Sequence, residues 1–330
     1  MIFKYIILFS TLFVTLTFAR NEGTCWIIDD QTQTLYTFNM QTLEAPKETT
    51  IDKVNEGEGL AYRPSTQELY MWDNANTIVR NADTGIIIRQ YPSPYANQVE
   101  GASFYIDPTT KEEELWVIVE EGANNNNPIP RNSRYIQKVN IDTGIVISGT
   151  RKKLIGGFID TDLNWGTDIG SLAIDPKTKQ FWITQDSYTR KLAKLNPSTG
   201  QVTDVITLEP TDTVDAEVLA FDINGFMYTE SDRGENRDDP RYLWKINATS
   251  GNMEKATPQF GIGTDGDLEG MACNAGADVI ANKSDFGDAP TQYTHVSHKI
   301  SSNLYLGNNV PDSENDQQST TDATGDGDDK

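Results

Sequence analysis

Short apolar runs separated by turn residues recur along the chain from residue 25 to residue 273. Five of these runs carry an aromatic residue followed by a carboxylate. They read CWIID (from Cys25), LYMWD (from Leu69), LWVIVE (from Leu115), FWITQD (from Phe181) and FMYTES (from Phe226). Runs of this length, rich in aromatic and β-branched residues, are typical of β-strands. The pattern therefore predicts an all-β protein.

A second pattern is a turn of Asn, then Thr or Ser, then Gly. It reads NADTG (from Asn81), NIDTG (Asn140), NPSTG (Asn196) and NATSG (Asn247), with a blurred copy, NMQTL, at Asn39. Asn and Asp side chains bond their own backbone, and Gly adopts the positive φ that other residues resist. Strand-like runs flank each copy, so each phrase predicts a hairpin turn between antiparallel strands.

A third pattern precedes each aromatic run except the first. It reads EGLAYRP (Glu58), EGASFYIDP (Glu100), GSLAIDP (Gly170), EVLAFDI (Glu217) and, at the end, EGMACN (Glu269). The order is therefore strand A, strand B, strand C, turn and strand D. The turn Asn residues lie 42, 59, 56 and 51 positions apart, and a unit of four strands at about 40–50 residues is typical of a β-propeller blade.

We count five blades, or six if residues 149–165 contain a degenerate one. A β-sandwich also has many short strands, but it does not need a period that continues from one end of the chain to the other. The first copy has strands B, C and D, and the last copy has only strand A. One blade is therefore predicted to combine strands from both ends of the chain.

This shared blade would place Cys25 close to Cys273, the two cysteines of the chain. We predict a disulfide between them, which would close the ring and contribute about 4–5 kcal/mol through loop-closure entropy. The alternative is two unpaired, buried thiols.

The two ends of the chain differ from the repeats. Residues 1–19 have a charged start, an apolar run and a small-residue exit at Ala19, the layout of a secretory signal peptide. The apolar run is shorter than the ~20 residues of a membrane span, so we expect a secreted or cell-surface protein without an integral membrane segment. Residues 20–276 would form the propeller, and residues 277–330 an acidic, largely irregular extension. Its DATGDGDD run is typical either of a solvated tail or of a flexible calcium loop.

The net charge of −22 argues against nucleic acid or anionic membrane as a partner, because phosphate binding needs clustered Lys and Arg. Carboxylates instead recur at the start of the predicted A strands, which are innermost in a propeller. The candidate metal ligands are Glu58, Glu100, Asp168, Glu217 and Glu269. Carboxylates at this density repel one another, and Ca²⁺ or Mg²⁺ would relieve the repulsion. The alternative is that each Glu bonds backbone N–H groups of the neighbouring blade.

Other recurring residues have simpler expected roles. The acids that end the B strands should cap strands or bond turn amides; they are Asp29, Asp73, Glu120, Asp186 and Glu230. The B-strand aromatics should pack between blades; they are Trp26, Trp72, Trp116, Trp182 and Tyr228. The His residues of the chain are His295 and His298, so a Ser-His-Asp triad within the repeats is excluded.

The stretches EGLAYRPSTQELYMWDN and LAIDPKTKQFWITQDSYTRKLAKLNPSTGQV resemble secreted propellers of the phytase-like, esterase-like class. The tail, from SDFGDAP through LYLG to its D-x-E-x-D run, resembles the start of the DFGDAP-type acidic module of large bacterial surface and secreted proteins. Together the resemblances imply an exported, surface-associated bacterial protein.

The sequence favours a binding module, with calcium as the candidate ion and an extracellular protein or glycan as the unidentified ligand. The alternative is an extracellular hydrolase, either a phytase-like phosphoesterase or a glycosidase, that uses the ring carboxylates. Whether the protein is an enzyme stays open on the sequence alone.

Overall fold

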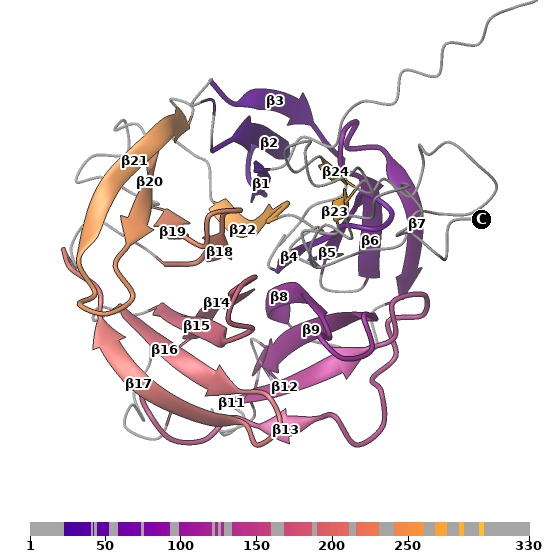
Figure 1. Cartoon of the computed structure of the whole chain (residues 1–330). Coiled ribbons are helices and arrows are strands. Elements are labelled where there is room, and N and C mark those ends of the chain that lie inside the picture. The colour runs from indigo at the N-terminus through magenta and orange to yellow at the C-terminus, as the bar shows by residue number, and fades with distance from the viewer. Residues whose placement is uncertain are drawn as a thin grey trace, which may run out of the picture.

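The computed structural model describes most of the repeat region and two short segments beyond it. The described residues are 23–40, 42, 45–52, 59–73, 76–92, 99–120, 123–124, 127–128, 134–159, 168–186, 190–210, 216–230, 241–260, 268–275, 284–286 and 297–299. They form five four-stranded antiparallel sheets arranged in a ring, a five-bladed β-propeller (Figure 1). The predicted fold class and the count of five blades are confirmed.

Each blade has four strands, which follow one another from the axis outward. Blade 1 consists of β22 (Leu268–Cys273), β1 (Thr24–Asp29), β2 (Thr34–Asn39) and β3 (Lys47–Thr50). Blade 2 consists of β4 (Leu60–Arg63), β5 (Glu68–Asp73), β6 (Asn76–Asn81) and β7 (Ile87–Pro92). Blade 3 consists of β8 (Val99–Ile106), β9 (Glu113–Glu120), β12 (Arg134–Val139) and β13 (Lys152–Lys153).

Blade 4 consists of β14 (Asp168–Ile174), β15 (Phe181–Asp186), β16 (Lys191–Asn196) and β17 (Gln201–Thr207). Blade 5 consists of β18 (Ala220–Phe221), β19 (Met227–Glu230), β20 (Arg241–Ile246) and β21 (Met253–Phe260). Two short pairs lie outside the blades: β10 (Ala123–Asn124) with β11 (Asn127–Pro128), and β23 (Ser284–Phe286) with β24 (Ser297–Lys299).

The innermost strands β22, β4, β8, β14 and β18 surround the axis, and each contacts the next around the ring (Figure 1). They all run in the same direction along the axis, so the ring has two different ends. We call the end at which the innermost strands begin the acidic end, because the predicted carboxylates Glu100, Glu217 and Glu269 lie there. We call the other the turn end, because it carries the turns between strands A and B and between strands C and D within the blades.

The apolar core is divided among the five spaces between blades. The buried apolar side chains of the described residues form five clusters, and each cluster draws on two adjacent blades. Successive residues of one strand serve different clusters; in β5, Leu69 faces blade 1 and Tyr70 faces blade 3. Every blade is therefore buried on both faces, which explains why the B strands are nearly continuous apolar runs.

The B-strand aromatics confirm the predicted packing role. Trp26, Trp72, Trp116, Trp182 and Tyr228 are all at most 7% exposed, and each lies in the cluster shared with the next blade. Trp26 shows the detail, because its ring stacks on Tyr62 of blade 2 at a centroid distance of 4.5 Å and its Nε1 donates to the Ala82 carbonyl at 2.9 Å. One large ring thus fills each space between blades.

The repeated turn phrase has a second role that the sequence pattern does not reveal. Its Asn side chain accepts hydrogen bonds from the turn amides, as at Asn81, whose Oδ1 lies 3.1 Å from the Asp83 nitrogen and 3.0 Å from the Thr84 nitrogen. Its Gly packs against the outer strand of the preceding blade. A Cβ on Gly200 would lie 2.0 Å from the Lys153 carbonyl oxygen, and one on Gly251 would lie 2.0 Å from the Thr207 carbonyl oxygen. The phrase is therefore a contact between blades as well as a hairpin turn.

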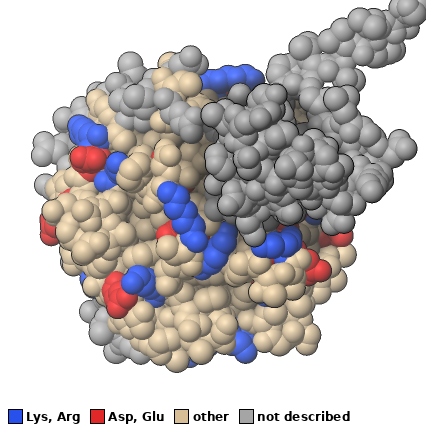
Figure 2. Space-filling view, in the orientation of Figure 1, with Lys and Arg blue, Asp and Glu red and all other residues tan. Residues whose placement is uncertain are grey.

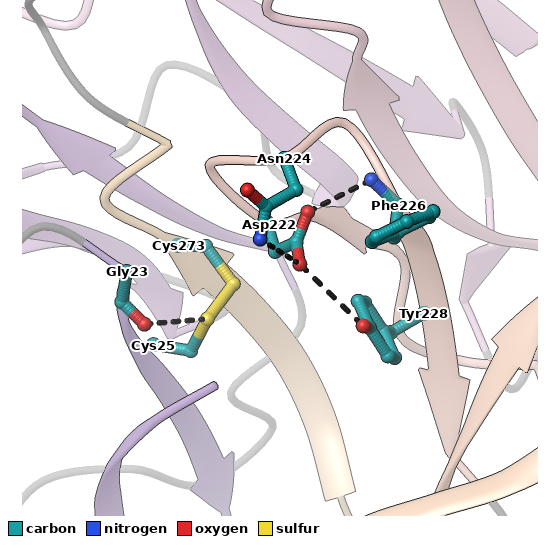
Figure 3. The surroundings of a disulfide bond; sticks show 7 residues. All are labelled: Gly23, Cys25, Asp222, Asn224, Phe226, Tyr228 and Cys273. Carbon is teal, nitrogen blue, oxygen red and sulfur yellow. Dashed lines mark hydrogen bonds between the residues drawn. A yellow bond between two sulfur atoms is a disulfide. The ribbon is translucent and has the colours of Figure 1, made fainter. Parts of the chain in front are cut away.

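The ring closes within blade 1, as predicted. Strand β22, from the C-terminal part of the chain, pairs with β1, and Cys25 lies directly opposite Cys273. The two cysteines form a disulfide with a Cα–Cα distance of 4.0 Å. The disulfide lies beside the β18–β19 turn, where Asp222 accepts hydrogen bonds from the Phe226 nitrogen at 2.8 Å and the Tyr228 hydroxyl at 3.4 Å (Figure 3).

The prediction of a strand directly after the blade 3 turn, from Ile145, is wrong. Residues 145–150 contribute an isolated bridge between Val139 and Val146, and the outer strand β13 comes later. The chain then crosses to blade 4, where Ile155 bonds Gly200 and Val202 through its backbone at 3.0 and 2.8 Å. Residues 149–159 therefore join two blades, and the six-bladed alternative is not needed.

Outside the ring, the pairing of β23 with β24 adds a short ladder to the extension, which was predicted to be largely irregular. The predicted signal peptide, residues 1–19, lies outside the described residues, as do the acidic residues of the last twenty positions. The part of the chain that the structure describes contains no helix long and apolar enough to cross a membrane.

Removing the disulfide should lower the stability of the ring without changing its architecture. The bond links residues 248 positions apart, and the loop-closure entropy of so long a segment corresponds to about 5 kcal/mol. We expect the Cys25→Ser, Cys273→Ser double variant to lose about that much in urea unfolding followed by Trp fluorescence. A reducing agent should lower the midpoint of the wild type and leave that of the double variant unchanged; an unchanged wild type would contradict the closure.

Gly200→Ala should destabilise the protein more than Gly149→Ala. Both glycines have positive φ, +78° and +82°, but no atom lies within 4 Å of a Cβ built on Gly149. Gly149→Ala should therefore cost only the about 1–2 kcal/mol of the left-handed conformation, whereas Gly200→Ala adds about 1–3 kcal/mol for displacing the blade 3 backbone. If chemical unfolding shows the same loss of stability in both variants, the contact between Gly200 and blade 3 does not add to the cost of the substitution.

Candidate functional site

Bulges mark the start of the innermost strands. The pairing of β8 with β9 skips Glu100, that of β14 with β15 skips Gly170, and that of β22 with β1 skips Glu269. These three residues belong to one column when the sequences of the A strands are aligned. A bulge takes one residue out of the ladder and redirects its side chain, and bulges are common beside functional sites. Two of the predicted carboxylates, Glu100 and Glu269, therefore coincide with interruptions of strand pairing, and the third bulge falls on Gly170.

Gly101, next to this column, and Gly170, within it, bring the innermost strands close together. A Cβ on Gly101 would lie 2.4 Å from the Leu172 nitrogen, and one on Gly170 would lie 2.3 Å from the Ala216 carbonyl oxygen. No side chain fits at such a distance, so these positions require glycine. Their close approach places Glu100 beside the start of β14, and the start of β14 beside Glu217. The order of carboxylates around the axis follows from this packing.

The structure places part of the predicted ligand set at one end of the ring. Glu100 is 9% exposed, and Glu217 and Glu269 are partly buried at the acidic end. Asp168 begins β14, although its side chain lies outside the described part of the structure, and Glu58 lies outside it altogether. The described residues include no group of three or more His, Cys, Asp or Glu side chains arranged to hold a metal ion, so the five-residue metal site stays a prediction.

A second set of carboxylates lies at the same end. Strands A and B are antiparallel, so the acids that end the B strands come next to the starts of the A strands. Asp168 pairs with Asp186 directly across β14 and β15, and Asp29 pairs with Leu268 beside Glu269. In the sequence the two series are separate, and the antiparallel order of the strands is the signal that could have joined them.

Two of the B-strand acids are more buried than their expected capping role required. Asp29 is 3% exposed and Glu230 0%. Asp29 also bonds a turn amide as predicted, since its Oδ1 accepts from the Thr32 nitrogen at 2.9 Å. Glu120 instead forms an ion pair with Arg134 on the neighbouring strand β12. The acidic end thus combines carboxylates held by turns, a carboxylate paired with arginine, and carboxylates at the bulges.

A small cavity lies on the axis of the ring. At the turn end the innermost strands enclose this cavity of about 90 Å³, bordered by small side chains such as Ala61, Ala173 and Ala272, and by Tyr105 and Lys179. This volume has room for a few water molecules and not for a sugar or a phosphate ester. A ligand of that size would therefore bind outside this cavity.

Charge is distributed unevenly over the surface. Figure 2 shows one face of the ring, on which Lys and Arg side chains gather near the axis and Asp and Glu side chains lie mostly further out. Beside the axis, the amine of Lys179 donates to the Pro176 carbonyl at 2.6 Å, and burial lowers its pKa. The net charge of the chain therefore does not describe every part of its surface.

At the turn end, the carboxylates between blades 2 and 3 are compensated by arginines. Glu68 accepts hydrogen bonds from Arg89 at 2.6 and 3.2 Å and from the Tyr70 hydroxyl at 3.2 Å. Arg63 donates to Glu113 at 2.8 Å. Burial alone raises the pKa of Glu68, but the hydrogen bonds from Arg89 and Thr66 outweigh it, and its pKa lies below the usual value. Burial and the Glu68 charge both raise the pKa of Tyr70, which stays a neutral phenol.

Glu68→Gln should lower stability at neutral pH and flatten its acid dependence. The folded state lowers the pKa of Glu68 below the reference value of 4.5, so its stabilising effect is complete above about pH 5 and is lost as the pH falls through the folded value. We expect the variant to lose about 2 kcal/mol at pH 7 and much less at pH 3. The exposed Glu48→Gln serves as the matched control for the loss of one carboxylate; an unaltered pH profile in Glu68→Gln would contradict the assignment.

Comparisons with known proteins give structural neighbours of low sequence identity. No family model matches the chain, and no curated protein matches it. Similar solved structures include a protein of unknown function from Bacteroides caccae, 12% identical, with a TM-score of 0.42 over 76% of this chain and 98% of that chain. A chain of a nidogen–laminin complex is 14% identical, with a TM-score of 0.42 over 76% and 85%.

A gluconolactonase from Xanthomonas campestris is 11% identical, with a TM-score of 0.41 over 73% of this chain and 78% of that chain. At this level of identity and overlap, none of these neighbours bears on the function of this chain. The resemblance to phytase-like and esterase-like propellers and the resemblance of the tail to a DFGDAP-type module therefore stay predictions.

Proposed function

We propose that this protein is an exported binding protein, and that its extracellular ligand is held at the acidic end of the ring through a bound calcium ion. The observation that carries this proposal is that two of the predicted carboxylates lie at bulges of the innermost strands. Glu100 and Glu269 occupy bulge positions in different blades, and Glu217 occupies the same column in a third. Strand pairing alone does not require an acid there.

The residue types favour a hard cation. Carboxylate oxygens predominate, and a bulge also releases backbone carbonyl groups from the ladder. Calcium accepts six to eight such oxygens in flexible geometry, whereas Mg²⁺ demands a near-octahedral site and retains its water. The second series of acids, including Asp29 and Glu230, adds negative potential around the same end.

Export is supported by two features of the chain. The disulfide is typical of oxidising compartments outside the cytoplasm, and the layout of residues 1–19 is that of a secretory signal. The resemblance of the tail to bacterial surface modules further favours attachment at the cell surface.

Calcium should stabilise the folded protein, and the acids of the column should carry the effect. At 1 mM calcium, a site with a Kd of about 10 µM adds about 2.7 kcal/mol, which corresponds to a rise in Tm of about 5–10 °C for a ring of this size. Glu217→Gln and Glu269→Gln should abolish most of this rise in thermal unfolding and weaken calcium binding in isothermal titration calorimetry.

Glu254→Gln provides the matched control, because Glu254 lies on the outer strand β21, away from the acidic end. A Tm that does not respond to calcium or to a chelator would refute the calcium site, as would a rise that survives in all three variants. If the protein hydrolyses phosphoester, ester or glycoside substrates and Glu217→Gln loses this activity, the protein is a hydrolase and the proposed binding function is wrong.

A further inference from the structure

A groove between blades 3 and 4 opens at the turn end, away from the acidic end. Its volume is about 1060 Å³, at the upper limit of ordinary ligand sites. Blade 3 provides one wall, including Trp116 and Lys152, and blade 4 provides the other, including Phe181 and Thr203. Tyr105 and Lys179 border both this groove and the cavity on the axis, so the inner end of the groove lies next to that cavity.

Aromatic rings form the inner part of the groove. The ring of Phe181 lies 5.7 Å from that of Tyr105 and 5.4 Å from that of Trp116, which meets it edge to face. Trp116 and Phe181 are 7% and 3% exposed, and Tyr105 is more open. Burial and the nearby charges of Asp107 and Glu114 raise the pKa of Tyr105. Its phenol therefore stays protonated and can both donate and accept a hydrogen bond.

The outer part of the groove is polar and close to electrically neutral. Lys138 pairs with Glu114, and Lys194 pairs with Asp204 at 2.8 Å. The side chains of Lys152, Ser198 and Thr203 make no hydrogen bond or ion pair with any other described residue. The groove therefore offers hydroxyl and amine groups to a ligand next to an accessible aromatic ring.

From these features we infer that the groove binds a neutral oligosaccharide. Sugar hydroxyls both donate and accept, as do the Ser, Thr, Asn and Gln side chains that predominate in the lining, and the apolar face of a sugar ring packs on an aromatic side chain such as Tyr105. The balanced lysine and carboxylate pairs favour a neutral ligand over a polyanion.

A protein partner fits the groove less well. Contact sites for proteins are enriched in Arg, Met and exposed aromatic anchors, and the described lining contains neither Arg nor Met. The most exposed large apolar side chains of the described residues, such as Ile86, Ile145 and Phe226, lie outside it. The site is separate from the proposed calcium site and does not depend on it.

The test uses the full-length protein and neutral oligosaccharides of four to six units: cello-, xylo-, malto- and chito-oligosaccharides, screened on an array and measured by isothermal titration calorimetry. We expect at least one series to bind and Tyr105→Ala to weaken its binding at least tenfold. Lys152→Ala and Thr203→Val should each weaken it severalfold. Lys177→Ala, in the same turn as Lys179 but outside the lining, should leave it unchanged.

If Tyr105→Ala unfolds the protein, Tyr105→Phe and Thr203→Val retain the packing and test the hydrogen bonds alone. Binding that persists with a calcium chelator supports the groove even if the calcium site fails. The inference is overturned if no neutral series binds, if Tyr105→Phe, Thr203→Val and Lys152→Ala all bind like the wild type, or if only charged glycans or peptides bind.

Discussion

The structure depends on the pairing of β22 with β1, because no blade has a core of its own. Each blade buries one face against the blade before it and the other against the blade after it. An open row of five blades would leave two apolar faces in water, at about 25 cal/mol for each Å² exposed. The antiparallel pairing of strands from opposite ends of the chain removes both faces at once, and the disulfide between Cys25 and Cys273 fixes it.

The spacing of the blades is set by two opposite devices. A large aromatic ring from each B strand keeps neighbouring sheets apart, as Trp26 does against Tyr62. Glycines let them meet where no side chain fits, at Gly101 and Gly170 near the axis and at Gly200 and Gly251 near the rim. The angle between blades follows from where bulk is present and where it is missing.

Much of this architecture could be predicted from the sequence because it repeats. The period, the turn chemistry and the complementary ends of the chain together specified the ring, the blade shared by both ends and the disulfide. The outer strand of blade 3 was predicted at the wrong place, because the run from Ile145 has strand-like residues. That run forms only one bridge to β12, at Val139, and β12 instead pairs with Lys152 and Lys153. Tertiary pairing overrode local propensity there.

The candidate sites could likewise be predicted only in part. The alignment of the A strands located the carboxylate column, but bulges arise from the mismatch between two paired strands and cannot be seen in one strand alone. The groove between blades 3 and 4 could not be predicted either, because Tyr105, Lys152 and Thr203 belong to three different strands and share no sequence pattern.

Because the turn glycines are packed tightly between blades, the two ends of the ring should differ in how well they tolerate insertions. Because Gly200 and Gly251 press against the carbonyl groups of the preceding blade, a longer or bulkier turn at that rim would force neighbouring sheets apart. The links between the second and third strands of the blades lie at the opposite end, and they already differ in length, with two residues between β5 and β6 and ten between β19 and β20. Segments that recognise a new ligand can therefore be inserted in those links without changing how neighbouring blades pack.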